Sequence, residues 1–293
     1  MTDKRIVFLR RTVSTAALWT VALWTIFSGW DIGFFALLTT LALVGLWEYY
    51  TMLERKRLPN FKIIGMICGA FMSVGGFYAI RRDGPAHAQD FEVAALLACM
   101  LVVFARQMFQ RTRDLSPLET MAFTVFGLFY VPWLFLFVTK IVYLTPLDGA
   151  GHVTGHFYVL WLLVVTKFSD MGAYLTGSVI GKHPMVPHIS PKKTWEGFFG
   201  ALAFSTGGAC GLLALMPNKL SYLKQSDAVI LGLGLGFAAV IGDLAESIVK
   251  RSADVKDSGA LLPGIGGALD LIDSILFTAP LLYFYLRFAL SLG

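Results

Sequence analysis

Carboxylate side chains recur at helical spacing in one short stretch of this chain, residues 243–274. Asp243 and Glu246 stand at i and i+3, so on a helix they share one face. Asp270 and Asp273 repeat that spacing on the next apolar segment. Two helices that present carboxylates at the same membrane depth can form an oxygen-ligand site for a hard cation. The stretch therefore predicts a metal site suited to holding phosphate groups.

Basic residues accompany these acids. Lys250 continues the first helix face, and Arg251 and Lys256 follow it, with Asp257 beside Lys256. These cations would meet phosphate charge that the metal ion does not neutralise. The glycine turn at residues 263–267, PGIGG, permits close approach to a ligand. A structural salt-bridge network is the alternative, but it does not account for the glycine turn.

An aspartate also lies inside an earlier apolar segment. Asp170 is followed by Gly172 and Ala173, small residues that allow a neighbouring helix to approach closely. Charged groups within apolar spans are costly and mark functional sites by default. We expect Asp170 to bind substrate; the alternative is a polar residue that hydrogen-bonds between helices.

The loop after this segment carries Ser190, Lys192 and Lys193 directly before another apolar run. Thr194 is a suitable N-cap, so that helix would begin with free N–H groups. Adjacent ammonium groups, a hydroxyl and a helix N-terminus together suit phosphate binding. The alternative is an ordinary basic cytoplasmic loop, which explains the lysines but not the residues around them.

Composition decides the class of protein that must position these groups. Of the 293 residues, 56% are hydrophobic and 15% charged, and the mean hydropathy is +0.68. Apolar stretches of roughly 20 residues, each long enough to span a bilayer, recur along the chain. A soluble helical protein could not bury so many, so we predict an all-α polytopic membrane protein with about nine transmembrane helices. These spans lie at about 13–30, 33–50, 61–80, 92–109, 118–141, 156–178, 196–216, 227–248 and 269–291.

Charge distribution then predicts the orientation. Most of the 24 lysine and arginine residues lie at the N-terminus and in the even-numbered loops, which the positive-inside rule assigns to the cytoplasm. Both motif-bearing loops would face cytoplasmic nucleotides, and the segregation of basic residues by loop argues against nucleic-acid binding. We divide the chain into N-terminal transmembrane helices, 1–150, and a C-terminal catalytic transmembrane region, 151–293. Cys68, Cys99 and Cys210 lie in apolar stretches and are expected to be buried rather than disulfide-bonded.

Two runs of residues carry a resemblance to a known family. The first run is Ser169-Asp170, Ala173-Tyr174, Gly177, Gly181-Lys182 and Ile189 to Gly197; the second is Ser247 to Arg251, Lys256-Asp257, Gly259, Pro263, Gly266-Gly267, Asp270 and Asp273. Together they cover about the last half of the chain, and both resemble conserved blocks of the phosphatidate cytidylyltransferases (CDP-diacylglycerol synthases).

The resemblance implies that CTP and phosphatidic acid react to give CDP-diacylglycerol and pyrophosphate in a lipid membrane. Asp243 and Asp270 would be the ligands of Mg²⁺, with Asp273 nearby and a second, monovalent cation allowed. Asp243, Asp270, Lys250 and Asp273 would be catalytic. Family members further imply a homodimer, and the compact length indicates a bacterial inner membrane. The expected substrate-binding residues are Asp170, Ser190, Lys192, Lys193, Arg251, Lys256 and Asp257.

The chain departs from the family pattern at two positions. Ile265 stands where the turn usually has histidine, and Leu271 where arginine usually follows Asp270. These departures leave open a catalytically inactive scaffold. Two further alternatives stay open: a cation-coupled membrane transporter, in which Asp170, Asp243 and Asp270 would bind the coupled cation, and a CTP-dependent lipid kinase of similar membrane architecture. The absence of repeat symmetry and the crowding of charge toward one face count against a transporter.

Overall fold

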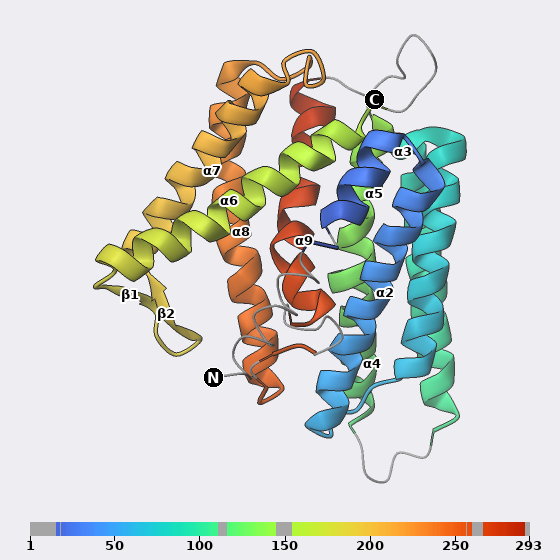
Figure 1. The fold of residues 1–293 in the computed structure, drawn as a ribbon. Coiled ribbons are helices and arrows are strands. Elements are labelled where there is room, and N and C mark those ends of the chain that lie inside the picture. Colours follow the sequence, from blue (N-terminus) through green and yellow to red (C-terminus); the bar gives the residue numbers. More distant parts are fainter. Residues whose placement is uncertain are drawn as a thin grey trace. The chain divides into compact units, whose positions relative to one another are not determined.

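The chain is almost entirely helical (Figure 1). A computed structural model describes residues 16–17, 19–110, 116–144, 154–255, 257–259 and 266–290. The predicted all-α class is confirmed. The labelled helices of the described residues are α2 (Asp31–Arg55), α3 (Lys62–Met108), α4 (Pro117–Leu128), α5 (Leu134–Leu144), α6 (His156–Ile180), α7 (Trp195–Leu215), α8 (Gln225–Ser252) and α9 (Ala268–Phe284). The described residues also form two π-helices, η1 (Phe129–Trp133) and η2 (Tyr285–Ala289), and two strands, β1 (Pro184–Val186) and β2 (Ser190–Thr194).

Seven helices among the described residues are long and apolar enough to cross a membrane, which makes this a multi-pass membrane protein. The predicted count of nine is not confirmed. The first predicted span corresponds to a shorter apolar helix, Trp19–Ser28, and two other predicted spans fall within α3.

Helix α3 changes direction at Gly84, where φ is +82° and Pro85 follows. Such a φ suits glycine, and proline interrupts the helical hydrogen bonds. The rings of Phe71 and Phe91 lie 5.8 Å apart, although twenty residues separate them. Residues on either side of Gly84 therefore pack together as two arms, which match the predicted spans 61–80 and 92–109.

The chain forms two compact units. One comprises residues 1–139 and 252–272, and the other comprises residues 140–251 and 273–293. The division of the chain at residue 150 into transmembrane and catalytic halves stays a prediction.

In the first unit, Glu48 of α2 fixes the beginning of α9. Its side chain is only 2% exposed. Glu48 Oε2 accepts hydrogen bonds from the Leu269 N–H at 2.9 Å and from Ser258 Oγ at 3.3 Å. A carboxyl group at a helix N-terminus satisfies an N–H group that has no partner within the helix. Glu48 thereby ties the first turn of α9 and the preceding loop to α2.

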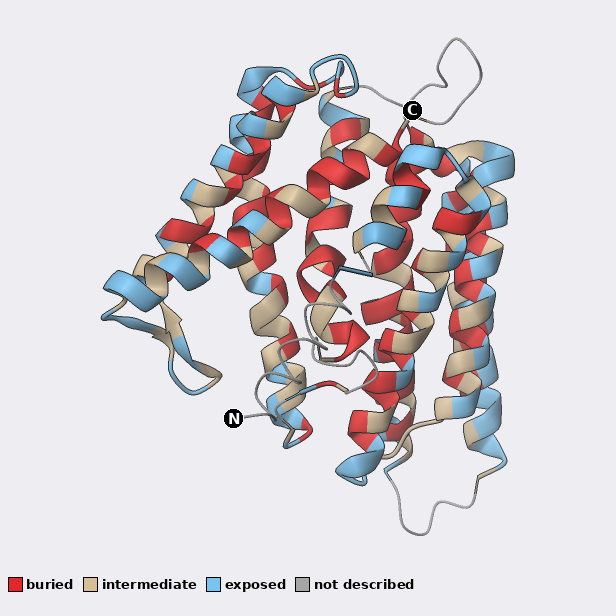
Figure 2. Ribbon diagram, viewed as in Figure 1, coloured by how far each residue is buried: buried red, intermediate tan, exposed pale blue. Residues whose placement is uncertain are grey.

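In the second unit, glycines allow the helices to approach closely. A Cβ atom at Gly172 of α6 would lie 2.5 Å from the carbonyl oxygen of Gly200 in α7, so the predicted role of Gly172 is confirmed. Similarly, a Cβ at Gly242 of α8 would lie 2.8 Å from the carbonyl oxygen of Asp273 in α9. The antiparallel strands β1 and β2 join α6 to α7 (Figure 1) and remain largely exposed or half-buried (Figure 2).

The two arms of α3 can be tested through Cys68 and Cys99. Both are buried, and Sγ of Cys99 lies 4.0 Å from the carbonyl oxygen of Cys68. We expect mild oxidation of the folded protein to join these thiols. After denaturation, mass-tagging of free thiols should then find one, Cys210, in the oxidised protein and two in oxidised Cys68→Ser. Three free thiols in the oxidised wild type would contradict the packing of the two arms.

The anchor of α9 is tested by Glu48→Leu. This change leaves the Leu269 N–H buried without its acceptor, and a hydrogen bond to a carboxylate contributes about 1.5–3 kcal/mol. We expect a midpoint of thermal unfolding in detergent several degrees lower, on the order of 2–8 °C. Glu48→Gln keeps an acceptor oxygen and should lose less. Equal midpoints for Glu48→Leu and the wild type would rule out the anchoring role.

Candidate active site

Three carboxylates of the second unit converge between α8 and α9. Asp243 and Glu246 come from α8 and Asp273 from α9, and one oxygen of each lies within 4.8 Å of the others. The spacing of Asp243 and Glu246 puts both on one helix face, as expected from i and i+3. Close approach of α8 to α9 at Gly242 brings Asp273 to the same face. We call these three residues the acidic group.

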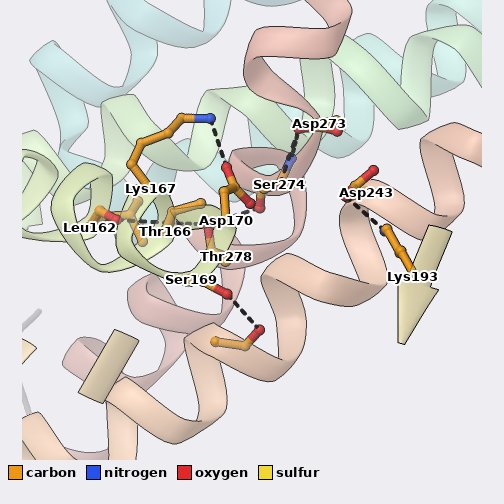
Figure 3. A network of polar contacts seen from close by, with 11 residues as sticks. Leu162, Thr166, Lys167, Ser169, Asp170, Lys193, Asp243, Asp273, Ser274 and Thr278 are labelled. Carbon is orange, nitrogen blue, oxygen red and sulfur yellow. Dashed lines mark hydrogen bonds and ion pairs between the residues drawn. The ribbon is translucent and has the colours of Figure 1, made fainter. Parts of the chain in front are cut away.

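The acidic group is largely shielded from solvent. Glu246 is 1% exposed and Asp273 is 6% exposed, while Asp243 is half-buried. Asp273 Oδ1 accepts hydrogen bonds from the N–H and the hydroxyl of Ser274, which fix its orientation. Figure 3 shows Asp273 and Asp243 on neighbouring helices with Asp170 of α6 nearby. Buried carboxylates this close repel one another unless cations lie among them.

Three lysines supply positive charge. Lys193 of β2 lies 2.7 Å from Asp243 Oδ2, Lys250 pairs with Glu246, and Lys167 lies 3.1 Å from Asp170 Oδ2. With every group ionised, four carboxylates face three ammonium groups, so one negative charge remains. A divalent cation would make the net charge of the site positive, and the site would then attract phosphates.

The geometry of β2 separates the two adjacent lysines of the predicted phosphate loop. Neighbouring strand residues point to opposite faces, so Lys193 reaches Asp243 while Lys192 is exposed. Thr194 is the N-cap of α7, and its Oγ1 accepts a hydrogen bond from the Gly197 N–H at 3.1 Å. The predicted N-cap is confirmed. Of these two lysines, only Lys193 forms an ion pair with Asp243.

Two contacts fasten the β1–β2 hairpin to helices of the same unit. Glu196, in the first turn of α7, accepts hydrogen bonds from the N–H groups of Lys182 and His183 at 3.1 and 3.3 Å. Arg251, at the end of α8, donates from Nε to the carbonyl oxygen of Ile189 at 3.4 Å. Arg251 is exposed and Ser190 of β2 half-buried. The hairpin is thus held at its base and near its tip, beside the acidic group.

The remaining predicted site residues are Asp270, Asp257 and Lys256. Asp270 belongs to the first unit, and its Oδ2 accepts a hydrogen bond at 2.8 Å from the N–H of Gly267, directly before α9. Such a bond is one half of a capping box, a structural role that spacing alone did not indicate. Asp257 is exposed in the same unit, and Lys256 lies outside the described residues.

Two residues of the site, Glu246 and Lys167, were not predicted to have a role in it. Glu246 was recognised on the Asp243 face but not chosen as a metal ligand, although its spacing was sufficient to do so. Lys167 was not among the predicted site residues. An ionisable residue within an apolar helix, three positions before Asp170, was the available signal.

The acidic group fits a hard divalent cation. Mg²⁺ binds oxygen ligands at about 2.0–2.1 Å in octahedral geometry, so ligand oxygens lie about 2.9 Å apart when adjacent and about 4.1 Å apart when opposite. Three carboxylate oxygens within 4.8 Å of one another reach that spacing through small side-chain rotations. Asp243, Glu246 and Asp273 would hold the ion, and Ser274 would orient one ligand.

Comparisons with known proteins identify the family to which the chain is similar. A family model described as the cytidylyltransferase family matches residues 9–289. A phosphatidate cytidylyltransferase of Bacillus subtilis (strain 168) is 32% identical over 256 residues, covering 86% of this chain and 88% of that protein. The Staphylococcus aureus (strain COL) protein of the same name is 36% identical over 241 residues, covering 79% and 84%.

A phosphatidate cytidylyltransferase of Mycobacterium leprae is 39% identical over 156 residues, which are 53% of this chain and 46% of that protein. The chain thus spans about half the length of the mycobacterial relatives it matches. The family match, by contrast, extends over nearly the whole chain. On that evidence, the chain belongs to the cytidylyltransferase family.

Proposed function

We propose that this chain is a phosphatidate cytidylyltransferase, which converts CTP and phosphatidic acid to CDP-diacylglycerol and pyrophosphate. The observation that carries the proposal is the acidic group of Asp243, Glu246 and Asp273, with Lys193 2.7 Å from Asp243. Triphosphate chemistry needs a cation site with lysines beside it. Relatives named for this activity match most of the chain.

The reaction needs no general base. A phosphatidate oxygen is ionised at neutral pH and attacks the α-phosphorus of CTP in line with the departing oxygen. An oxygen–phosphorus bond forms as the bond between the α-phosphorus and the β-phosphate oxygen breaks. Pyrophosphate leaves with that electron pair. The isoleucine at position 265, where the family usually has histidine, therefore removes no obligatory proton acceptor.

Residues of the second unit take complementary roles. Asp243, Glu246 and Asp273 would hold Mg²⁺, which supplies charge neutralisation on the pyrophosphate leaving group. Lys193 would exchange its carboxylate partner for a CTP phosphate. Lys250, paired with Glu246, keeps that carboxylate oriented and adds positive charge. Asp270, Lys192, Lys256 and Asp257 remain candidates from the family resemblance, as does a second, monovalent cation.

The membrane setting follows from the substrates. Phosphatidic acid stays anchored by its acyl chains, whereas CTP arrives from water, so the site must be accessible to both. We place the N-terminus and both motif-bearing loops in the cytoplasm of a bacterial inner membrane, in keeping with the distribution of lysine and arginine. A homodimer is retained as a prediction from the family resemblance.

The position of the label in CTP distinguishes the proposed activity from its rivals. Purified protein is incubated with Mg²⁺, phosphatidic acid and CTP labelled at either the α- or the γ-phosphorus, and the lipid is extracted. We expect label in lipid from α-labelled CTP only. Label from γ-labelled CTP would identify a lipid kinase. Cation-driven flux into proteoliposomes without CTP turnover would identify a transporter.

The metal ligands are tested by Asp243→Asn and Asp273→Asn. Each change removes a charged oxygen ligand while preserving volume, and we expect a loss in rate of at least about 100-fold. Asp270→Asn should cost as much if the family resemblance holds at that position. Asp90→Asn, at an exposed position on α3, is the matched control. Near-normal synthesis of CDP-lipid by purified Asp243→Asn or Asp273→Asn would refute the ligand assignment.

A further inference from the structure

Lys167 lies in the middle of α6, eleven residues after its first residue and thirteen before its last. The helix is apolar enough to span a membrane. A lysine in such a position is costly unless an anionic partner meets it. Its presence therefore requires an explanation that the mechanism above does not supply.

Asp170 is one partner of Lys167. The Nζ atom lies 3.1 Å from Asp170 Oδ2, and the two side chains are 30% and 40% exposed. Ion pairs at i and i+3 on one helix recover only a small part of what a charge in an apolar span costs. Because both side chains stay partly accessible, an anion that enters the site can approach the ammonium group.

The surroundings of Lys167 are those of the acidic group. Asp273 lies within electrostatic range of Lys167, Asp170 and Asp243. Figure 3 shows the Lys167 side chain on α6 reaching toward Asp170, on the other side of the acidic residues from Lys193. Lys167 and Lys193 thus approach this site from two different elements, α6 and β2.

The two lysines differ in the medium from which an anion can reach them. Lys193 stands on the β1–β2 hairpin, outside the candidate membrane spans, whereas Lys167 stands within one. A nucleotide arrives from water, and a lipid phosphate arrives with its acyl chains in the bilayer. An intramembrane ammonium group beside a cation site therefore matches the phosphate of the lipid.

We propose that Lys167 binds the phosphate of the lipid acceptor and that Asp170 holds its side chain in place until lipid arrives. This inference rests on the proposed function and adds to it the residue that selects the lipid substrate. Lys193 serves the nucleotide, so loss of Lys167 affects the two substrates unequally.

The test is the change in KM for each substrate in mixed micelles. Lys167→Met keeps the length of the side chain and removes its charge. We expect KM for phosphatidic acid to rise at least about tenfold, while KM for CTP changes less than about twofold. Lys167→Arg should restore part of the lipid affinity. Equal increases in both KM values, or no increase for phosphatidic acid, would overturn the proposal.

A double variant separates lipid binding from neutralisation of Asp170. If Lys167 only compensates that carboxylate, Lys167→Met combined with Asp170→Asn should recover a normal KM for phosphatidic acid. We expect no recovery. Thermal unfolding in detergent identifies variants that are misfolded. KM values are compared only among variants whose unfolding midpoints equal that of the wild type. If Lys167→Met is misfolded, Lys167→Gln takes its place.

Binding without turnover distinguishes failure of this inference from failure of the proposed function. Fluorescent phosphatidic acid is titrated into detergent-solubilised protein without CTP, and anisotropy reports binding. We expect Lys167→Met to bind at least about tenfold more weakly than the wild type, even if no CDP-lipid is formed. Equal binding by the two proteins would overturn the role of Lys167 while leaving the proposed reaction standing.

Discussion

The acidic group of Asp243, Glu246 and Asp273 is the constraint on which the second unit depends. Carboxylates inside apolar helices are tolerated only where opposite charge meets them. Here they converge because Gly242 of α8 lets that helix approach α9 closely. The lysines then come from three different elements, α6, β2 and α8. An excess of one negative charge makes the arrangement receptive to a divalent cation.

In the first unit, two carboxylates accept hydrogen bonds from backbone N–H groups near the start of α9. Glu48 of α2 satisfies the N–H of Leu269 at the start of α9, and Asp270 satisfies the N–H of Gly267 just before it. Both bonds fix where α9 begins. Asp273 stands one turn further along the same helix, so the start of α9 also sets the position of that carboxylate along the helix.

Local patterns in the sequence predicted much of this arrangement. Apolar stretches predicted the helices, the residue type at position 194 predicted an N-cap, and the spacing of Asp243 and Glu246 predicted their shared face. The contacts that were not predicted depend on the conformation of the folded chain. The strand that turns Lys192 away from Lys193 was read as a loop. The bond from Asp270 to Gly267 and the reach of Glu48 to α9 join groups whose partners spacing alone does not reveal.

The central claim is that Asp243, Glu246 and Asp273 bind one divalent cation, and Mn²⁺ binding tests it most directly. Electron paramagnetic resonance of Mn²⁺ titrated into the purified protein counts bound ions without requiring turnover. Our account predicts one tightly bound ion in the wild type and its loss in Glu246→Gln, with binding unchanged in Asp90→Asn. Undiminished Mn²⁺ binding by folded Glu246→Gln, or none by the wild type, would contradict it.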